Sequence, residues 1–332
     1  MLQILRKIAF PFSLIYALVI HIRNFLFDIG VFKSKSYNTP TICIGNLSVG
    51  GTGKTPMIEC LVRMLEGHKV AVLSRGYRRK TKGFLLADQT SSVSDLGDEP
   101  FQIHKKFPSI YVAVDADRRN GIEQLEKLVH PDVILLDDAF QHRKVKPTFS
   151  ILLTSYGKLY SKDWYLPTGN LRDSKREARR ANLIIVTKCP IMLSQAEKSK
   201  TILSLKPAVG QKVLFSSLAY AKHFKNTEGK EVTASEFNGK QIALVTGIAS
   251  PAPLVSHLKD ENFEFQHLQF GDHHDFSPEE INRMKQFDVV LTTEKDFVRL
   301  QGKLEQLYYL EIAHAFGTED QALLEKAVKD QI

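Results

Sequence analysis

Cysteine is scarce in this chain of 332 residues, which contains three, Cys43, Cys60 and Cys189. They lie far apart, and no two of them form a Cys-x-x-Cys pair. Disulfide frameworks and zinc knuckles both need closely matched cysteines, so the sequence indicates neither. The scarcity is typical of a protein from a reducing compartment.

Internal repeats, low-complexity tracts and nucleic-acid-binding patterns are also missing. The formal net charge of +8 favours an anionic partner, whether a nucleic acid, a polyphosphate or a membrane surface. Basic residues cluster at 75–82, 118–119 and 172–180, but no helix-turn-helix and no interleaving of basic and aromatic residues accompanies them. We therefore expect no nucleic-acid partner.

A long hydrophobic run occurs at the N-terminus, where residues 8–22, between Lys7 and Arg23, are uncharged and mostly apolar. As a helix this run covers roughly 23 Å, which is short of the hydrocarbon core of about 30 Å. Basic residues at both ends favour a helix that lies among the lipid headgroups. A core helix, a signal peptide and a full span are the alternatives, although no small-residue cleavage site follows. We expect residues 1–32 to be a membrane-associating segment.

A glycine-rich loop follows the apolar run 41–45 and precedes a helical pattern of apolar residues from Ile58 to Leu65. In such loops the glycines let several backbone N–H groups point at a polyphosphate. Lys54 is predicted to contact the β- and γ-phosphates, and the Thr55 hydroxyl to bind Mg²⁺. The usual pattern has glycine where this chain has Ser48. The predicted nucleotide-binding residues are Ser48, Val49, Gly50, Gly51, Thr52, Gly53, Lys54 and Thr55.

Strand-like apolar runs alternate with helical patterns through most of the chain. The first series lies at 41–45, 69–74, 110–114, 132–136, 149–153, 183–187 and 213–217, and the second at 241–248, 263–270, 287–292 and 307–312. Such alternation is typical of an α/β fold with a mostly parallel sheet and helices on both faces. Turn-rich residues from 222 to 240 separate the two series. We predict a P-loop NTPase-like core in 33–220 and a smaller C-terminal α/β domain with its linker in 221–332.

Two carboxylates, Asp137 and Asp138, end the apolar run that begins at Val133. At the carboxyl end of a central strand, one aspartate can reach Mg²⁺, and the other can hold a second metal ion or a basic group. Because a phosphate loop precedes them, we predict that both lie at a metal site.

Other polar residues leave more than one interpretation open. Asp98 follows a glycine in a predicted turn. His273 and His274, flanked by carboxylates, can bind metal, relay a proton or cap a helix at Ser277. Lys188 ends a strand-like run, where it either contacts a purine or is an ordinary surface lysine. Spacing alone does not separate these roles.

Seven motifs stand in order along the chain: residues 45–56, Ser74-Arg75-Gly76-Tyr77, Gly97-Asp98-Glu99-Pro100, Asp137-Asp138-x-Phe140-Gln141-His142, Gly169-x-Leu171-Arg172, Asp272-His273 and Thr292-Thr293-Glu294-Lys295-Asp296. Together they resemble the motifs of the tetraacyldisaccharide 4′-kinases, the lipid A 4′-kinases of Gram-negative bacteria. The resemblance runs from the hydrophobic N-terminus to about Asp296, and Ser48 matches that family's own variant of the loop. At Gly169-Asn-Leu-Arg172-Asp173 the chain has aspartate where the family has glutamate, which leaves the role of Asp173 open.

The resemblance implies a kinase that uses ATP and Mg²⁺ to phosphorylate the 4′-hydroxyl of a tetraacylated glucosamine disaccharide 1-phosphate in lipid A biosynthesis. It implies work at the cytoplasmic face of the bacterial inner membrane, as a peripheral or monotopic protein. The lipid precursor and the anionic membrane surface are then its partners, with no obligate protein partner. The implied roles are phosphate and Mg²⁺ binding by Lys54 and Thr55, metal binding by Asp137 and Asp138, base catalysis by Asp98 with help from His273, and substrate contact by Tyr77 and Arg118.

Two alternatives share the phosphate loop. A soluble P-loop switch, such as a metal-insertion GTPase, would hydrolyse nucleotide slowly without an acceptor. No Asn-Lys-x-Asp guanine motif supports it, since the nearest candidate, residues 187–190, lacks the aspartate. A soluble kinase of nucleosides or cofactors would give no reason for the apolar N-terminal run.

Overall fold

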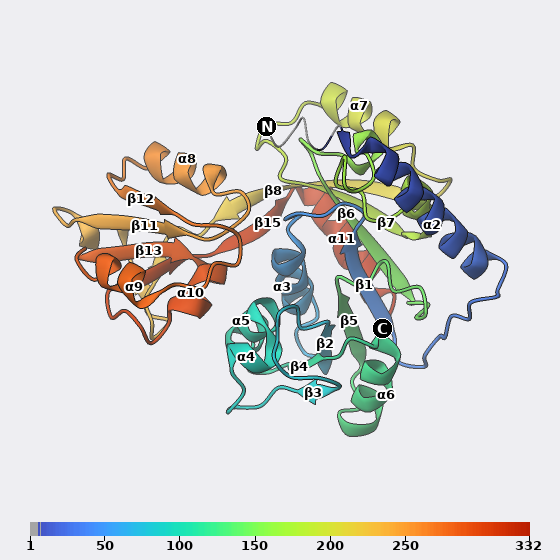
Figure 1. Ribbon diagram of the computed structural model, residues 1–332, viewed down its shortest axis with the longest axis horizontal. Helices are drawn as coiled ribbons and strands as arrows, with labels where there is room; N and C mark the ends of the chain where they lie inside the picture. Colours follow the sequence, from blue (N-terminus) through green and yellow to red (C-terminus); the bar gives the residue numbers. More distant parts are fainter. Residues whose placement is uncertain (1–5, 7) are drawn as a thin grey trace.

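The computed structural model describes residue 6 and residues 8–332. Two α/β domains, each built on its own sheet, lie side by side, and two long strands run from one toward the other (Figure 1). The predicted fold class is confirmed. Of the predicted segment 1–32, residues 1–5 and 7 lie outside the described residues.

The large domain is built on a nine-stranded sheet in the order β15-β8-β7-β6-β1-β5-β2-β4-β3. Neighbouring strands are parallel, except that β3 and β15 run antiparallel to β4 and β8. Because β1 lies between β5 and β6, its carboxyl end is a switch point where α/β proteins bind ligands. The strands are β1 (Thr41–Asn46), β2 (Val70–Ser74), β3 (Leu85–Leu86), β4 (Tyr111–Val114), β5 (Val133–Asp137), β6 (Phe149–Ser155), β7 (Leu183–Thr187), β8 (Lys212–Tyr220) and β15 (Ile312–Phe316).

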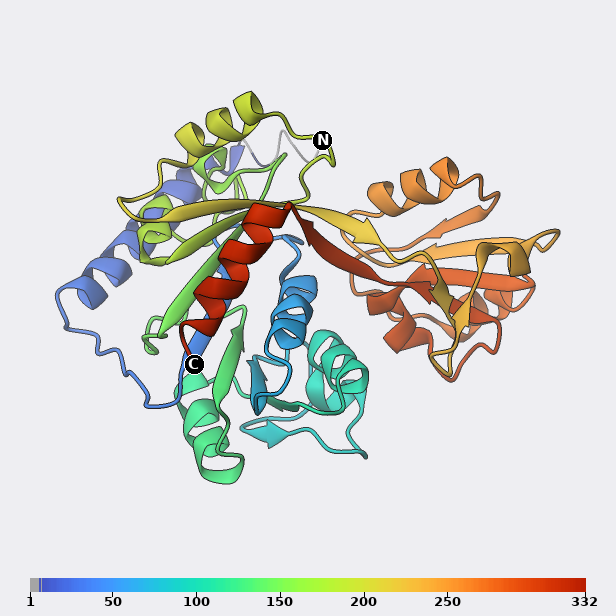
Figure 2. The same cartoon turned by 180° about the vertical axis from the view of Figure 1, so that it is seen from behind.

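Helices cover both faces of this sheet because its central strands are apolar on both sides. In β1, Cys43 enters one core, while Ile42 and Ile44 enter the other. The first core receives α6 (Arg118–Leu128) and α7 (Gln195–Leu205), and the second receives α3 (Lys54–Met64), α5 (Asp98–Lys106) and α11 (Thr318–Lys329). Figure 2 shows α11 lying against the strands. The shorter helices are α4 (Val93–Leu96), η1 (Tyr160–Lys162) and η2 (Lys175–Arg180).

The small domain has a six-stranded sheet in the order β10-β9-β14-β13-β11-β12. Its strands are β9 (Phe224–Lys225), β10 (Glu231–Val232), β11 (Ile242–Thr246), β12 (Gln266–Gln269), β13 (Val289–Thr293) and β14 (Leu307–Leu310). Its helices are η3 (Ala234–Phe237), α8 (Ala252–Asp260), α9 (Pro278–Met284) and α10 (Glu294–Leu300).

The pairing of the sheets differs from the predicted division at the C-terminus. The prediction placed all of 221–332 in the smaller domain. Instead, β15 pairs with β8 in the large sheet, with Ile312 opposite Tyr220, and Leu324 and Val328 of α11 pack in the large core. An apolar pattern identifies a strand or helix but does not say which sheet it joins. The sequence therefore did not predict that the chain re-enters the large domain at β15.

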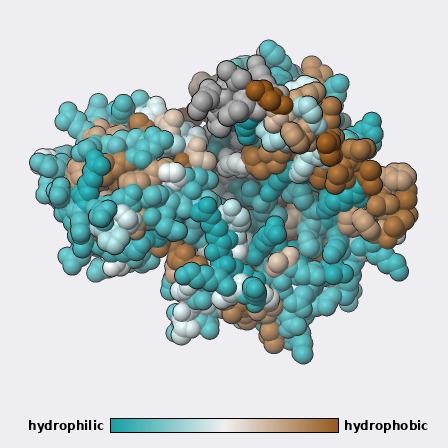
Figure 3. All heavy atoms as spheres, viewed as in Figure 1, coloured by the Kyte–Doolittle hydropathy of each residue, from teal (hydrophilic) through white to brown (hydrophobic). Residues whose placement is uncertain are grey.

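Helix α2 (Phe10–Asp28) lies across one side of the large domain (Figure 1). Its buried residues are the polar Ser13 and Asn24, whereas Phe12, Leu18 and other apolar side chains are more than half exposed. Figure 3 shows hydrophobic residues gathered over this helix. The helix is 19 residues long and apolar enough to cross a membrane, a test that many core helices and signal sequences also pass. It therefore contacts the protein with its polar side and presents its apolar side outward.

Candidate active site

A cavity of about 1040 Å³ lies between the two domains. Its walls contain every site residue predicted from the sequence. The large domain supplies the glycine-rich loop and the two aspartates at the end of β5, and the small domain supplies His273 and Lys295. The cavity therefore joins the predicted nucleotide and acceptor groups in one space.

Residues 48–53 form the phosphate loop between β1 and α3, and Lys54 begins the helix. Gly53 has φ +86°, a backbone conformation that strains any residue with a Cβ, and a Cβ there would also crowd His314 Nε2 at 3.0 Å. The Thr187 hydroxyl donates to the Thr52 carbonyl at 2.8 Å. The loop is thus held from outside while its N–H groups stay available at a helix N-terminus, the geometry that binds phosphate.

His314 on β15 is a support of this loop that sequence reasoning missed. Its Nε2 lies 2.9 Å from the Gly53 carbonyl, and its Nδ1 lies 2.9 Å from Ser216 Oγ. Burial lowers the pKa of the imidazole to about 4, so it is neutral near pH 7. The carbonyl accepts the Nε2 proton, and Nδ1 accepts from the serine hydroxyl. No sequence motif identifies His314, because only the fold brings β15 next to the phosphate loop.

The pKa values of Asp137 and Asp138 are shifted in opposite directions. Burial raises the pKa of Asp137 to about 7, and the charges of Glu99 and Asp138 add to the effect. Its Oδ2 accepts from Ser74 Oγ at 2.9 Å, but the buried Oδ1 has no partner among the described residues. Burial also opposes the charge of Asp138, but Lys54, at 3.7 Å, and Arg172 outweigh it and lower its pKa.

These residues fit a magnesium ion. An unpartnered buried carboxylate oxygen beside a phosphate loop is the kind of ligand that Mg²⁺ accepts. Within residue 6 and 8–332, no cluster of three or more His, Cys, Asp or Glu side chains is suited to a metal. This is consistent with Mg²⁺ in nucleotide sites, where one or two carboxylates act together with phosphates and water. Thr55 lines the same cavity.

Asp98 and His273 come from different domains and meet in the cavity. His273 Nδ1 lies 2.9 Å from Asp98 Oδ2, and Lys295 Nζ lies 3.0 Å from His273 Nε2. Lys295 can only donate, so these contacts assign the remaining ring proton to Nδ1, which donates to Asp98. Burial opposes the charge of Asp98, but the hydrogen bond from His273 and the positive charges of Arg299 and Lys295 outweigh it and lower its pKa.

Gly97 makes this meeting possible on the large-domain side. It has φ +88°, and a Cβ there would lie 2.6 Å from the Tyr77 carbonyl. The Tyr77 loop can therefore lie directly against the start of α5. Tyr77 is 64% exposed, and its ring contacts that of His273 edge-on at 5.6 Å between centroids.

Arg118 lines the cavity but is only 3% exposed. Its Nη1 donates to the Asp115 carbonyl at 2.9 Å, and its Nη2 donates to the Asp137 carbonyl at 3.0 Å. These two contacts tie the residue after β4 to the end of β5, where the two aspartates begin.

Sequence reasoning gave no role to Arg172, Lys295 or Arg299. Arg172 contacts both oxygens of Asp138, with 3.0 Å from Nη1 to Oδ2. Arg299 Nη1 lies 3.3 Å from Asp98 Oδ2. Two of the three stand inside quoted motifs, so a signal was present, but the partner of each lies far away in the sequence.

His274, the second of the paired histidines, makes its contacts within the small domain. His274 Nε2 lies 2.9 Å from Glu280, and its ring stacks on Phe270 at 4.8 Å between centroids. Ser277 caps α9, accepting from the Glu280 N–H at 3.3 Å. Of the open interpretations of His274, a role beside the helix cap fits these contacts.

Comparisons with known proteins point the same way as the geometry. The family model described as Tetraacyldisaccharide-1-P 4′-kinase matches residues 5–332. The tetraacyldisaccharide 4′-kinase of Flavobacterium johnsoniae is 50% identical over 327 residues, which cover 96% of this chain and 95% of that protein. That of Bacteroides thetaiotaomicron is 44% identical over 316 residues, covering 89% and 83%.

A solved structure extends the similarity to three dimensions. It is a crystal structure of the "apo" form of LpxK from Aquifex aeolicus in complex with ATP, with a TM-score of 0.81 and 31% identity. The match covers 98% of this chain and 99% of that one. The resemblance expected from the motifs is confirmed, and this chain belongs to the tetraacyldisaccharide 4′-kinase family.

Proposed function

We propose that this protein transfers the γ-phosphate of ATP to the 4′-hydroxyl of a tetraacylated glucosamine disaccharide 1-phosphate, a step of lipid A biosynthesis. The observation that carries the proposal is the single cavity in which the phosphate loop faces the Asp98–His273 pair. Family membership, at up to 50% identity among the relatives compared, supports it over a soluble switch or a small-molecule kinase.

The nucleotide half binds and aligns the donor. Backbone N–H groups of residues 50–53 surround the phosphates, and Lys54 neutralises charge on the β- and γ-oxygens. When bound by Thr55, Asp137 and Asp138, Mg²⁺ supplies further charge neutralisation on the phosphates. Phosphate transfer through a loose transition state asks mainly for this alignment and neutralisation.

The acceptor half activates the sugar hydroxyl. The 4′-oxygen attacks the γ-phosphorus, the bond to the β–γ bridging oxygen breaks, and ADP leaves. The hydroxyl proton passes to the Asp98 carboxylate, which its lowered pKa keeps ionised. His273 orients this carboxylate through its Nδ1 proton.

Tyr77 and Arg118 are assigned different parts in substrate binding. The exposed Tyr77 ring is free to pack on the disaccharide beside His273. Arg118 contributes positive charge to the cavity wall, but its Nη contacts to the Asp115 and Asp137 carbonyls indicate that its main task is to hold the ends of β4 and β5 together.

A lipid acceptor requires the protein to work at a membrane. The outward apolar side of α2 fits a helix lying in the interface, since burying each such large side chain is worth about 1.5–3 kcal/mol. Polar contacts along α2, from Ser13 to Asp28, tie it to the large domain, which favours a peripheral or monotopic position over a span. We assign the protein to the cytoplasmic face of the inner membrane, where ATP is present.

The proposal is tested with labelled ATP and three conditions: a tetraacylated disaccharide 1-phosphate in detergent micelles, an acylated monosaccharide, and no acceptor. The expected result is labelled disaccharide lipid and little free phosphate. Hydrolysis of ATP at the same rate in all three conditions would instead indicate a switch protein. Labelling of a soluble nucleoside or sugar in place of the lipid would indicate a small-molecule kinase.

A further inference from the structure

The polar side of α2 leads to the nucleotide half of the cavity, and from its contacts we infer that Asn24 and Asp173 form a positioning pair. Through this pair, α2 holds the segment 168–173 in place, and that segment fixes Asp138 and the phosphate loop. The inference rests on the proposed assignment of the nucleotide site and gives Asp173 a role.

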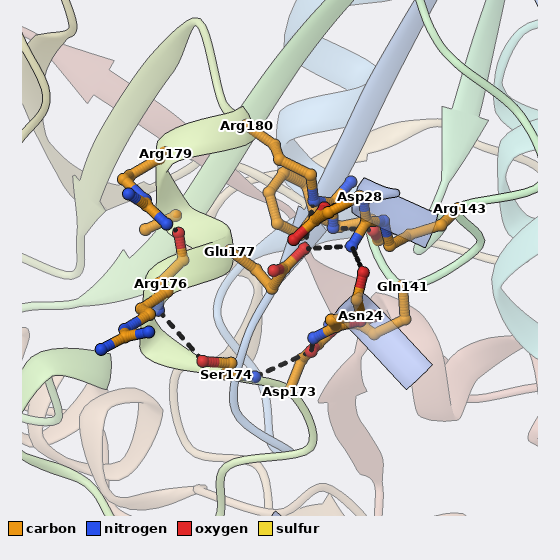
Figure 4. A network of polar contacts seen from close by, with 12 residues as sticks. Asn24, Asp28, Gln141, Arg143, Asp173, Ser174, Arg176, Glu177, Arg179 and Arg180 are labelled. Atoms are coloured by element: carbon orange, nitrogen blue, oxygen red, sulfur yellow. Dashed lines mark hydrogen bonds and ion pairs between the residues drawn. The ribbon is translucent and has the colours of Figure 1, made fainter. Parts of the chain in front are cut away.

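The pair itself is buried and close. Asn24 Nδ2 donates to Asp173 Oδ1 at 2.7 Å, and the Ser174 N–H donates to the same oxygen at 2.7 Å. Asp173 is 0% exposed and Asn24 is 4% exposed. Figure 4 shows the side chains of Asn24 and Asp173 lying next to each other. A carboxylate buried this completely costs free energy unless donors surround it, so the contact with Asn24 is needed where it stands.

Asp173 faces the helix and not the cavity. Its Oδ2 lies 3.9 Å from Arg23 Nη1 of the same helix and has no hydrogen-bond partner among the described residues. Arg172 lines the cavity, whereas Asp173 does not. Asp173 therefore contacts α2, whereas its neighbour Arg172 contacts the nucleotide site.

Further contacts join the same segment to α2. Ser13 Oγ lies 2.7 Å from Thr168 Oγ1, and the Tyr16 hydroxyl donates to the Arg172 carbonyl at 3.1 Å. Together with Asn24, these residues follow one side of the helix, at spacings of three, eight and eleven residues. This stripe holds both ends of the segment 168–173.

The opposite side of the segment meets the nucleotide site directly. The Val49 N–H donates to the Asn170 carbonyl at 2.8 Å, and the Arg172 N–H donates to the Leu47 carbonyl at 2.9 Å. The Arg172 guanidinium contacts Asp138, and its Nη2 donates to Asn46 Oδ1 at 2.5 Å. A shift of 168–173 would therefore move a metal aspartate and the start of the phosphate loop together.

The test measures nucleotide binding in solution, with no lipid present. The full chain is titrated with fluorescent N-methylanthraniloyl-ATP and Mg²⁺. Asn24→Ala is expected to raise the Kd about tenfold, the order of effect of losing one hydrogen bond to a charged group. Tyr16→Phe, which removes only a hydroxyl, is expected to raise it by a smaller factor. A folded Asn24→Ala protein with the wild-type Kd would overturn the inference, because a purely structural anchor would lower Tm and leave Kd unchanged.

A control variant separates this role from membrane binding. Leu18 lies on the exposed side of the same helix. The Leu18→Ser protein is expected to keep the wild-type Kd for nucleotide in solution and to bind vesicles of phosphatidylglycerol less well.

A charge exchange tests the pair itself. Asn24→Asp places two carboxylates against each other and is expected to bind nucleotide more weakly than Asn24→Ala. The double variant Asn24→Asp/Asp173→Asn restores a donor and an acceptor, so it is expected to recover affinity. No recovery, or a Leu18→Ser Kd as poor as that of Asn24→Ala, would contradict a specific pair.

The experiment is separate from the kinase assay. Wild-type protein that binds the nucleotide but phosphorylates no glycolipid would contradict the proposed function and would not contradict this inference.

Discussion

The two halves of the cavity are built in different ways. Lys54 follows the loop after β1, and Asp137 ends β5, the parallel neighbour of β1. Hydrogen bonds from Thr187 and His314 hold this loop. Asp98 and His273 belong to separate domains and meet through one contact of 2.9 Å. In the proposed mechanism, the residues that hold the phosphate donor therefore belong to one domain, whereas the residues that activate the acceptor come together only where the two domains meet.

This difference predicts that each half can be damaged without the other. Asp98→Ala should lower the transfer rate by about two to four orders of magnitude, the usual worth of a general base, while ATP affinity stays nearly unchanged. Steady-state transfer and equilibrium nucleotide titration measure the two effects on one preparation. Asp98→Asn serves as the control that keeps the shape of the side chain. A large loss of ATP affinity in either variant would show that Asp98 acts in nucleotide binding.

Lys54→Ala should damage the nucleotide half and lower transfer by about two to three orders of magnitude, because one preorganised charge contact on the transferring phosphate is worth that much. Unlike Asp98→Ala, it should also weaken binding of ATP. Titration with labelled nucleotide distinguishes the two variants. Near-normal turnover would remove the phosphate loop from the mechanism.

His273→Ala tests the junction between the domains. It should lower kcat about tenfold or more, since Asp98 loses a hydrogen bond, and leave the KM for ATP unchanged. The lowered pKa of Asp98 keeps wild-type activity down to a pH below the ordinary aspartate value of about 3.9. Without His273 that pKa rises, so the acid limb of the pH profile should move to higher pH. An unmoved limb with a raised KM for ATP would assign His273 to the nucleotide.

His314→Gln should have the smallest effect on transfer and a clear effect on stability. With the folded pKa at about 4, the unfolded state binds the proton first as the pH falls below 6.5. Between pH 7 and pH 4 the wild type should lose on the order of 3 kcal/mol more unfolding free energy than the variant. Urea titrations at several pH values provide the measurement. Parallel losses in both proteins would mean that His314 is not buried as a neutral group.

The sequence was sufficient to predict the strand, loop and helix of the proposed nucleotide half, because that information is local. A strand, a glycine loop and a helix stand next to one another in the chain, and Asp137 and Asp138 end a recognisable strand. The α/β class followed from the alternation of apolar patterns. Each of these features depends on the spacing of neighbouring residues.

The missed features all depend on contacts between distant residues. Arg299 reaches Asp98 across 201 positions, and His314 reaches Gly53 across 261. Both cross the boundary that the alternation suggested. Arg299, on α10, reaches Asp98 where the two domains meet, and His314 reaches Gly53 because β15 pairs in the large sheet. Asp173 was left open for the same reason, since its partner Asn24 lies in a segment interpreted only by its hydrophobicity.

The most direct test of the account identifies where the phosphate goes. Purified protein is given ATP, Mg²⁺ and the tetraacylated disaccharide 1-phosphate, and the lipid product is analysed by ³¹P–¹H correlation NMR. The account predicts a new phosphomonoester coupled to the proton at the 4′ position, present with wild-type protein and absent with Asp98→Ala. Inorganic phosphate alone from a folded protein, or a phosphate at another position, would contradict it.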